Sequence, residues 1–157
     1  NLDLGQLEIL AKKIANNLDI GDLLFLKGEL GAGKTTFCRL LIHSLYKRYS
    51  IDKPNIIRSP SFPILITYEL NNFQIYHYDF YRLKSDNELK ELNFFEEINK
   101  NITIVEWPEI IFKYNKIENY YLFNFKIINS KKREIEIFHT KKNNLQNVVW
   151  YIKLYFW

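Results

Sequence analysis

The chain has 157 residues and carries 22 Lys and Arg against 18 Asp and Glu, for a formal net charge of +4. This length suits one domain with a substantial core and excludes a motor or a multidomain ATPase. No apolar run approaches the roughly 18 residues of a membrane span. The single cysteine, Cys38, excludes an intramolecular disulfide and suits a reducing compartment. We therefore expect a cytoplasmic protein without a membrane partner.

The first predicted elements are a helix, a strand and a second helix. Apolar residues recur at helical spacing over residues 7–18 and predict an amphipathic helix, after which Gly21 turns the chain. The apolar run 23–26 predicts a buried strand, and residues 36–42 predict a helix. Residues 46–55 are polar, and we expect a turn there.

A hairpin and a short helix are expected in the middle of the chain. Residues 64–70 and 73–79 predict two strands joined by a tight turn at Asn71 and Asn72. Ser85 is followed three residues later by a glutamate, which is the capping pattern of a helix over residues 85–92.

Three more strands are expected in the second half. Residues 102–105 predict a buried strand that ends at Glu106, and residues 119–128 and 133–139 predict a strand pair around the polar turn 129–132. Strands that alternate with helices indicate an α/β fold, and the two hairpins indicate a mixed parallel and antiparallel sheet.

Residues 28–35 read Gly-Glu-Leu-Gly-Ala-Gly-Lys-Thr and match the phosphate-binding pattern G-x-x-x-x-G-K-[ST] at every fixed position. We call them the phosphate loop. A predicted strand precedes the loop and a predicted helix follows it, which is the context that the motif requires. Its glycines let successive N–H groups point at phosphate oxygens, and the helix presents its positive end to the same anion. Lys34 is expected to reach the β- and γ-phosphates, and the Thr35 hydroxyl to ligate Mg²⁺.

Three further polar sites are candidates for a nucleotide-hydrolysing centre. The rigid turn Ser59-Pro60-Ser61-Phe62 carries two hydroxyls suited to sensing a γ-phosphate, although it also suits an ordinary surface turn. Asp79 and Glu106 each end a predicted strand, where open α/β sheets bind ligands. Either acid can serve Mg²⁺ or its waters, or merely cap a helix. For His77 and Tyr81 a packing or surface role is favoured over catalysis.

The charge is distributed unevenly along the chain. Residues 1–112 carry 13 Lys and Arg against 15 Asp and Glu, whereas residues 113–157 carry 9 against 3. The basic end suits contact with RNA or with an acidic protein. A solvated basic surface is favoured over such contact, because the chain is rich in Lys, Asn and Ile throughout.

Four strings together resemble the bacterial TsaE family in order and spacing. They are the phosphate loop with Thr36 and Phe37, then Ser59–Phe62, then Tyr-His-Tyr-Asp-Phe-Tyr-Arg-Leu at 76–83, and Val-Glu-Trp-Pro-Glu at 105–109. The resemblance covers residues 5–140. It implies a small ATPase that assists the biosynthesis of threonylcarbamoyladenosine beside the anticodon of tRNA. It also implies a single P-loop NTPase-type three-layer domain over residues 1–140. Residues 141–157 have no counterpart in the family, and we expect them to form an aromatic and basic tail packed on or extending the same domain.

The resemblance also implies roles for individual residues. Glu106 matches a metal-site glutamate that acts with Thr35 on Mg²⁺, Asp79 matches an acid needed for ATPase activity, and Trp107 adjoins the metal-site acid. Ser61 stands where the family usually has threonine in a switch-like loop, so the hydroxyl is kept. The expected catalytic residues are Lys34, Ser61, Asp79 and Glu106. The expected ATP-binding residues are Gly28, Glu29, Leu30, Gly31, Ala32, Gly33, Lys34, Thr35, Thr36 and Arg133.

Partners follow from the same resemblance. The family acts with TsaD and TsaB, which transfer the threonylcarbamoyl group, and its ATP hydrolysis regulates or resets their complex. Direct contact with tRNA stays open. A slow ATPase is expected from the chain alone, because no pair of a water-positioning side chain and an arginine finger is identifiable. Arg82 and Arg133 are the arginine candidates, and a structural ion pair is favoured for Arg82. Two other classes stay open: a small-molecule kinase, although residues 84–101 lack the arginine of a lid, and a non-hydrolysing nucleotide- or RNA-binding module.

Overall fold

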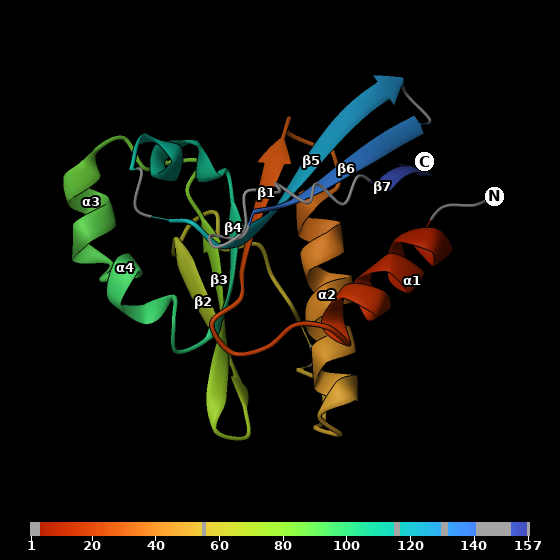
Figure 1. The fold of residues 1–157 in the computed structure, drawn as a ribbon, viewed down its shortest axis with the longest axis horizontal. Helices are drawn as coiled ribbons and strands as arrows, with labels where there is room; N and C mark the ends of the chain where they lie inside the picture. The colour runs from red at the N-terminus through yellow and green to blue at the C-terminus, as the bar shows by residue number, and fades with distance from the viewer. Residues whose placement is uncertain (1–3, 55, 115–116, 130–131, 141–151, 157) are drawn as a thin grey trace.

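A mixed sheet forms the centre of this computed structural model, which describes residues 4–54, 56–114, 117–129, 132–140 and 152–156 (Figure 1). Its strand order is β2-β3-β4-β1-β5-β6-β7. The central strands β3, β4, β1 and β5 are parallel, and β2, β6 and β7 run antiparallel to their neighbours. The strands are β1 (Leu23–Gly28), β2 (Leu65–Leu70), β3 (Phe73–Asp79), β4 (Ile102–Glu106), β5 (Tyr120–Asn129), β6 (Lys132–Thr140) and β7 (Ile152–Phe156).

Helices cover both faces of the sheet, so the predicted three-layer α/β architecture is confirmed (Figure 1). One face carries α1 (Leu4–Ala15) and α2 (Lys34–Arg48). The other face carries α3 (Asp86–Glu91), α4 (Phe94–Glu97) and the 3₁₀ helix η1 (Pro108–Lys113). Because β1, β3 and β4 are parallel, the ends at Gly28, Asp79 and Glu106 meet at one edge of the sheet.

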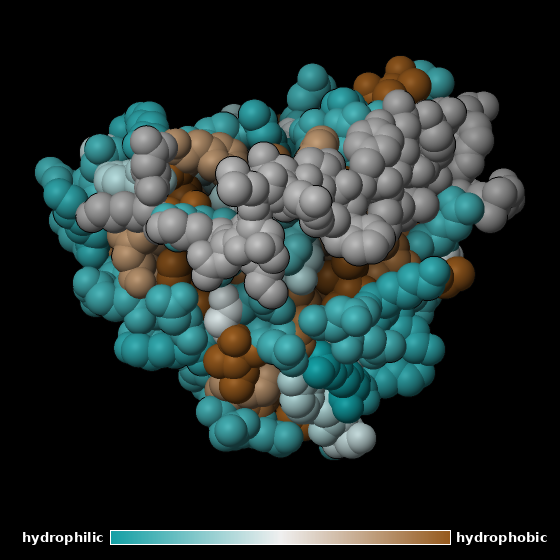
Figure 2. Space-filling view, in the orientation of Figure 1, coloured by the Kyte–Doolittle hydropathy of each residue, from teal (hydrophilic) through white to brown (hydrophobic). Residues whose placement is uncertain are grey.

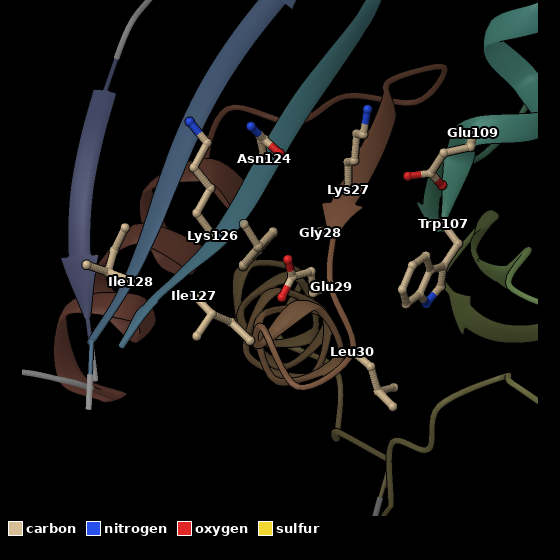
Figure 3. A pocket seen from close by; sticks show the side chains of 11 residues that line it. Lys27, Gly28, Glu29, Leu30, Trp107, Glu109, Asn124, Lys126, Ile127 and Ile128 are labelled. Carbon is tan, nitrogen blue, oxygen red and sulfur yellow. The ribbon is translucent and has the colours of Figure 1, made fainter. Parts of the chain in front are cut away.

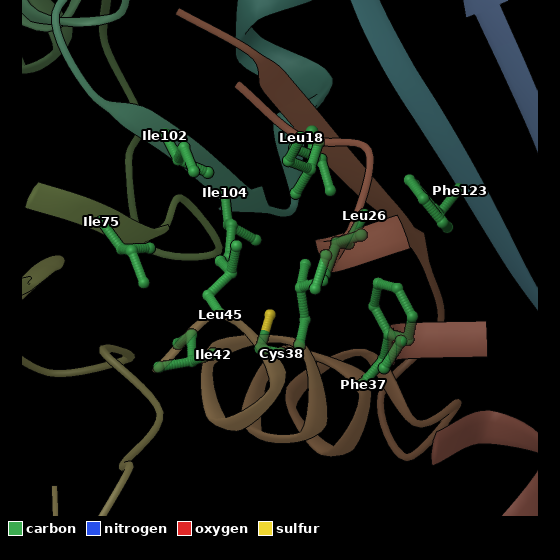
Figure 4. Packing of buried hydrophobic residues seen from close by; sticks show 14 of the residues in the cluster. Leu18, Leu26, Phe37, Cys38, Ile42, Leu45, Ile75, Ile102, Ile104 and Phe123 are labelled. Carbon is green, nitrogen blue, oxygen red and sulfur yellow. The ribbon is translucent and has the colours of Figure 1, made fainter. Parts of the chain in front are cut away.

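Two apolar cores follow from the alternation of side chains along β1. Leu24 and Leu26 face α1 and α2, whereas Leu23 and Phe25 face the opposite layer. In Figure 4, Phe37, Cys38 and Ile42 project from α2 into the first core. Each fully buried aliphatic or aromatic side chain contributes about 1.5–3 kcal/mol. The sheet is therefore held on both faces, and its edge is a rigid platform.

The sequence-based elements are largely confirmed, but the bounds of the first two helices were wrong: the helix predicted over residues 7–18 is α1 (Leu4–Ala15), and the one predicted over residues 36–42 is α2 (Lys34–Arg48). The hairpin of β2 and β3, the strand pair of β5 and β6, and the capping box at Ser85 are all present. The turn expected over residues 46–55 begins later, because α2 continues to Arg48. Leu45 and Tyr46 extend its buried stripe, and the guanidinium of Arg48 donates to the carbonyls of Ala15 and Leu18. The structure also contains α4 and η1, which pack into the second core and which no sequence pattern predicted.

The predicted tail is described only over residues 152–156. There the backbone forms β7, which pairs antiparallel with β6 and lengthens the sheet. Residues 141–151 and 157 of the predicted tail lie outside the described residues. Within the described ranges no helix is both long and apolar enough to cross a bilayer. The face seen in Figure 2 is mostly hydrophilic outside the grey region, with separate small apolar patches.

Gly28, the last residue of β1, has a backbone that excludes a side chain. Its φ is +145°, and a Cβ there would lie 2.4 Å from the Phe125 carbonyl oxygen. We expect Gly28→Ala to lower the free energy of unfolding by at least about 2 kcal/mol. Gly5→Ala is the matched control, because Gly5 lies in α1 with no atom near its added methyl. Urea unfolding should show the control unchanged or up to about 1 kcal/mol more stable. Equal stabilities of the two variants would contradict this.

Candidate functional site

The phosphate loop joins the end of β1 to the start of α2, as the sequence predicts. Gly28, Gly31 and Gly33 all have positive φ, which curls the backbone inward. Gly33 is the N-cap of α2 and has no side chain to occupy the N–H groups of the first turn. The loop is therefore open to an anion at the positive end of a 15-residue helix.

Lys34 lies across its own loop. Its Nζ donates to the carbonyl oxygens of Gly28 at 2.6 Å and Glu29 at 2.9 Å. The side chain is 5% exposed, and burial lowers the pKa of its ammonium from the ordinary value against the attraction of Glu106 and Asp79. The ammonium is thus already positioned within the loop to bind an anion.

Glu106, the last residue of β4, carries a carboxylate with 2% exposure. Its Oε2 accepts a hydrogen bond from the Thr35 hydroxyl at 2.9 Å, and its Oε1 lies 3.0 Å from Nε2 of His77. Nδ1 of His77 is buried and lacks a partner among the described residues. The neutral Nε2–H tautomer fits best, since a protonated ring would bury an unsatisfied Nδ1–H. His77 therefore donates to Glu106 and holds the carboxylate toward the phosphate loop.

Asp79 lies beside Glu106 because β3 and β4 pair these two residues in register. Its Oδ1 accepts from the backbone N–H of Tyr81 at 3.0 Å, and its Oδ2 lies 3.4 Å from the Ser59 hydroxyl. Burial raises the pKa of the Asp79 carboxyl, and the negative charge of Glu106 adds to the rise. Two neighbouring buried carboxylates with few donors favour a bound cation.

Trp107 covers the phosphate loop from the end of β4. Its φ of +57° is unusual for a bulky residue and turns the chain before Pro108. The ring lies 3.9 Å from Nζ of Lys34 and 4.8 Å from the ring of Tyr81, measured to ring centroids. The indole thus shields the lysine by a cation–π contact.

Two hollows flank the phosphate loop and share Leu30 and Trp107. The smaller, of about 260 Å³, is lined by the loop residues together with Ser59, Ser61, Asp79, Tyr81 and Glu106. The larger, of about 620 Å³, lies between the loop, Trp107 and the end of β5, with Lys27, Asn124 and Lys126 at its polar side (Figure 3). Its size is that of small-molecule sites.

The structure brings most of the sequence-predicted site residues together. Lys34, Thr35, Asp79, Glu106 and Ser61 all line the smaller hollow, as do Leu30, Gly31, Gly33 and Thr36. Gly28, Glu29 and Leu30 line the larger one, and Ala32 is buried beneath the loop. Arg133 lies apart from both hollows. It is paired in register with Ile127, a lining residue, and its guanidinium donates to the carbonyl of Asn129 at 2.8 Å.

His77 is the site residue that sequence reasoning set aside. The side chain is fully buried, as a packing role requires, yet its Nε2 contacts the Glu106 carboxylate. A signal was present in the alternation of β3, since Ile75, His77 and Asp79 share one face of the strand. That face points toward α2, the helix that follows the phosphate loop.

The arrangement suits a phosphorylated ligand with a divalent cation. Backbone N–H groups and Lys34 supply positive charge, whereas Thr35, Asp79 and Glu106 supply the oxygen ligands that Mg²⁺ prefers. The donor set therefore fits a nucleotide–Mg²⁺ complex.

Comparison with known proteins gives consistent results. The family model of the threonylcarbamoyl adenosine biosynthesis protein TsaE matches residues 3–137. The chain is 42% identical over 137 residues to the tRNA threonylcarbamoyladenosine biosynthesis protein TsaE of Rickettsia conorii, covering 87% of this chain and 75% of that protein. It is 45% identical over 134 residues to the protein of the same name from Rickettsia typhi, covering 85% and 87%. The crystal structure of Bacillus subtilis YdiB superposes with a TM-score of 0.61 and 25% identity, covering 89% and 82%.

The ionised carboxylate of Asp79 should lower the free energy of unfolding at neutral pH. Because its folded pKa is raised above the ordinary 3.8, its contribution to stability is complete below that pH and is lost as the pH rises through the raised pKa. Asp79→Asn keeps an acceptor for the Tyr81 N–H. We expect urea unfolding to show the variant more stable than wild type near pH 7 and equal to it at low pH.

The exposed Asp52 provides the control, because Asp52→Asn should leave stability unchanged at both pH values. A loss of stability in Asp79→Asn near pH 7 would instead show that the carboxylate makes a net favourable interaction in the fold, for which the Lys34 ammonium is a candidate partner.

Proposed function

We propose that this chain, which belongs to the TsaE family of threonylcarbamoyl adenosine biosynthesis proteins, is a cytoplasmic ATPase that supports this tRNA modification. One observation carries the proposal. The Thr35 hydroxyl of the phosphate loop is bonded at 2.9 Å to a buried strand-end carboxylate, that of Glu106. This pairing is the arrangement that a phosphate-loop protein uses to hold Mg²⁺ on a nucleotide.

ATP binding in this proposal uses both hollows. The phosphates occupy the smaller hollow against the loop N–H groups, and the nucleoside occupies the larger one beside β5. Lys34 exchanges its contacts with the loop carbonyls for the β- and γ-phosphates. Thr35 and Glu106 hold Mg²⁺, which supplies charge neutralisation for the phosphate oxygens when bound.

Turnover in this proposal depends on Asp79 and on water. Asp79 is held by the Tyr81 N–H and by Ser59, so its carboxylate keeps one orientation next to Glu106. In that orientation it accepts a hydrogen bond from the attacking water, and its raised pKa makes it a stronger base than an ordinary aspartate. Ser61, which also lines the hollow, donates to the γ-phosphate in this proposal.

A slow reaction by the chain alone agrees with the absence of an arginine among the residues that line the smaller hollow. Arg82 is not among these lining residues, and its guanidinium carbon lies 5.8 Å from the Phe62 ring centroid. Two large apolar side chains in or next to the segments that line this hollow are exposed, Leu30 at 79% and Phe62 at 83%. Exposed apolar side chains beside a reactive site are available to a protein partner. We assign that partner to the TsaD–TsaB pair, whose complex the ATPase cycle regulates or resets.

Nucleotide binding and turnover should separate by residue. Lys34→Ala removes the cation on the terminal phosphates and should weaken ATP binding by roughly tenfold to a hundredfold. Glu106→Gln and Asp79→Asn keep the loop intact, so calorimetry should show affinity for a slowly hydrolysed analogue within a few-fold of wild type. Phosphate release with the partners present should fall by about a hundredfold or more in both variants.

A radiolabelled-ATP assay distinguishes the other classes. Free phosphate indicates an ATPase, label in a small acceptor indicates a kinase, and no turnover indicates a binding module. An unchanged phosphate-release rate in Glu106→Gln would overturn its metal-site assignment.

Ser61 should make partner binding depend on the nucleotide. A γ-phosphate orders a neighbouring loop only through contacts that ADP does not make. We expect a non-hydrolysable ATP analogue to strengthen association with TsaD and TsaB more than ADP does, and Ser61→Ala to reduce that difference. Affinities measured by biolayer interferometry test this, with Ser50→Ala, remote from the hollow, as control. Equal wild-type affinities in both nucleotide states would rule the switch out.

A further inference from the structure

A third ionisable side chain faces the Glu106 carboxylate from beneath. Cys38 projects from α2 toward the sheet (Figure 4) and is fully buried. One ligand atom each of Cys38, His77 and Glu106 can be chosen so that all three lie within 4.8 Å of one another. The cluster therefore joins a thiol, an imidazole and a carboxylate from three different elements: α2, β3 and β4.

This set of ligands is chemically different from the Mg²⁺ set. Sulfur and imidazole nitrogen favour thiophilic cations such as Zn²⁺, whereas Mg²⁺ takes oxygen ligands almost alone. Tetrahedral Zn²⁺ has Zn–S of about 2.3 Å and Zn–N of about 2.0–2.1 Å, which places ligand atoms about 3.3–3.6 Å apart. The three ligand atoms lie within 4.8 Å of one another, and those of His77 and Glu106 lie 3.0 Å apart, so the cation must draw them to this spacing as it binds.

We propose that Cys38, His77 and Glu106 form a buried site for one thiophilic divalent cation, of which Zn²⁺ is the best match. Three protein ligands leave the fourth position to water. The ion reaches the site past Glu106, which lines the smaller hollow. On binding, the thiol loses its proton to solvent and becomes the thiolate ligand. His77 stays neutral by moving its proton from Nε2 to Nδ1.

Burial of the cluster sets the free-energy cost that a bound cation must overcome. Nδ1 of His77 lacks a partner among the described residues, so the tautomer change buries an unpaired N–H there, and the new bond from the cation to Nε2 must exceed that cost. Burial raises the pKa of the Cys38 thiol well above its ordinary value, and Glu106 raises it further. The thiol thus stays protonated until a cation that binds sulfur strongly displaces the proton.

One consequence rests on the proposed function. Glu106 is shared between this site and the proposed Mg²⁺ site, so a cation bound to Cys38 and His77 takes a ligand from Mg²⁺. Zn²⁺ bound to Cys38 should then lower the rate of Mg²⁺-dependent ATP hydrolysis.

Cobalt titration of the full chain tests the site without nucleotide. Because Cys38 is the only cysteine, a thiolate-to-cobalt charge-transfer band reports on this residue alone. We expect one equivalent of Co²⁺ to produce the band, and Zn²⁺ to displace it. Zn²⁺ affinity should fall at least about tenfold in Cys38→Ser and in His77→Gln. His43→Gln, on the same helix, should keep wild-type affinity.

Failure of the site and failure of the proposed function give different results. Absence of the band in wild type at saturating Co²⁺, or unchanged Zn²⁺ affinity in Cys38→Ser with a wild-type circular dichroism spectrum, overturns the site. The wild-type titration decides even if a variant fails to fold. A band without any ATP turnover leaves the site standing and counts against the ATPase alone.

Discussion

A single buried carboxylate connects the phosphate loop to the sheet. Glu106 accepts from Thr35 of α2 on one oxygen and contacts His77 of β3 on the other, while its own backbone belongs to β4. With 2% exposure it depends on these donors, since an unpaired carboxylate at that depth would be costly. Loop, helix and two strands are consequently held in one geometry by one side chain.

The pairing of the parallel strands decides what lies beside that carboxylate. Leu26 of β1 and Asp79 of β3 are both in register with Glu106, so the loop on one side and the second acid on the other are set by backbone hydrogen bonds. The apolar cores on both faces keep that register, because a shift by one residue would turn Leu24, Leu26 and their neighbours to the wrong layer. Site geometry is therefore a product of core packing.

Local signals made much of this predictable from the sequence. The glycine spacing of the loop, the alternation in β2 and β3 and the Ser85 capping pattern each depend on a few adjacent residues, and each is confirmed. What local signals could not give is the contact of residues far apart in the chain. His77 meets Glu106 only after β3 and β4 pair, and Cys38 approaches them only when α2 packs on the sheet. The helix at residues 94–97 likewise needs the Tyr78 and Phe80 rings that it packs against.

The contact of Gly28 with Phe125 ties the loop mechanically to β5. No side chain separates the two backbones, and β1 and β5 are hydrogen-bonded along five residue pairs that end at this contact. Because no side chain between the two backbones can adjust, a displacement of β5 toward β1 would move Gly28, the first residue of the loop, as well. Since β6 and β7 are joined to the rest of the sheet through β5, a movement of these antiparallel strands is transmitted through β5 to Gly28.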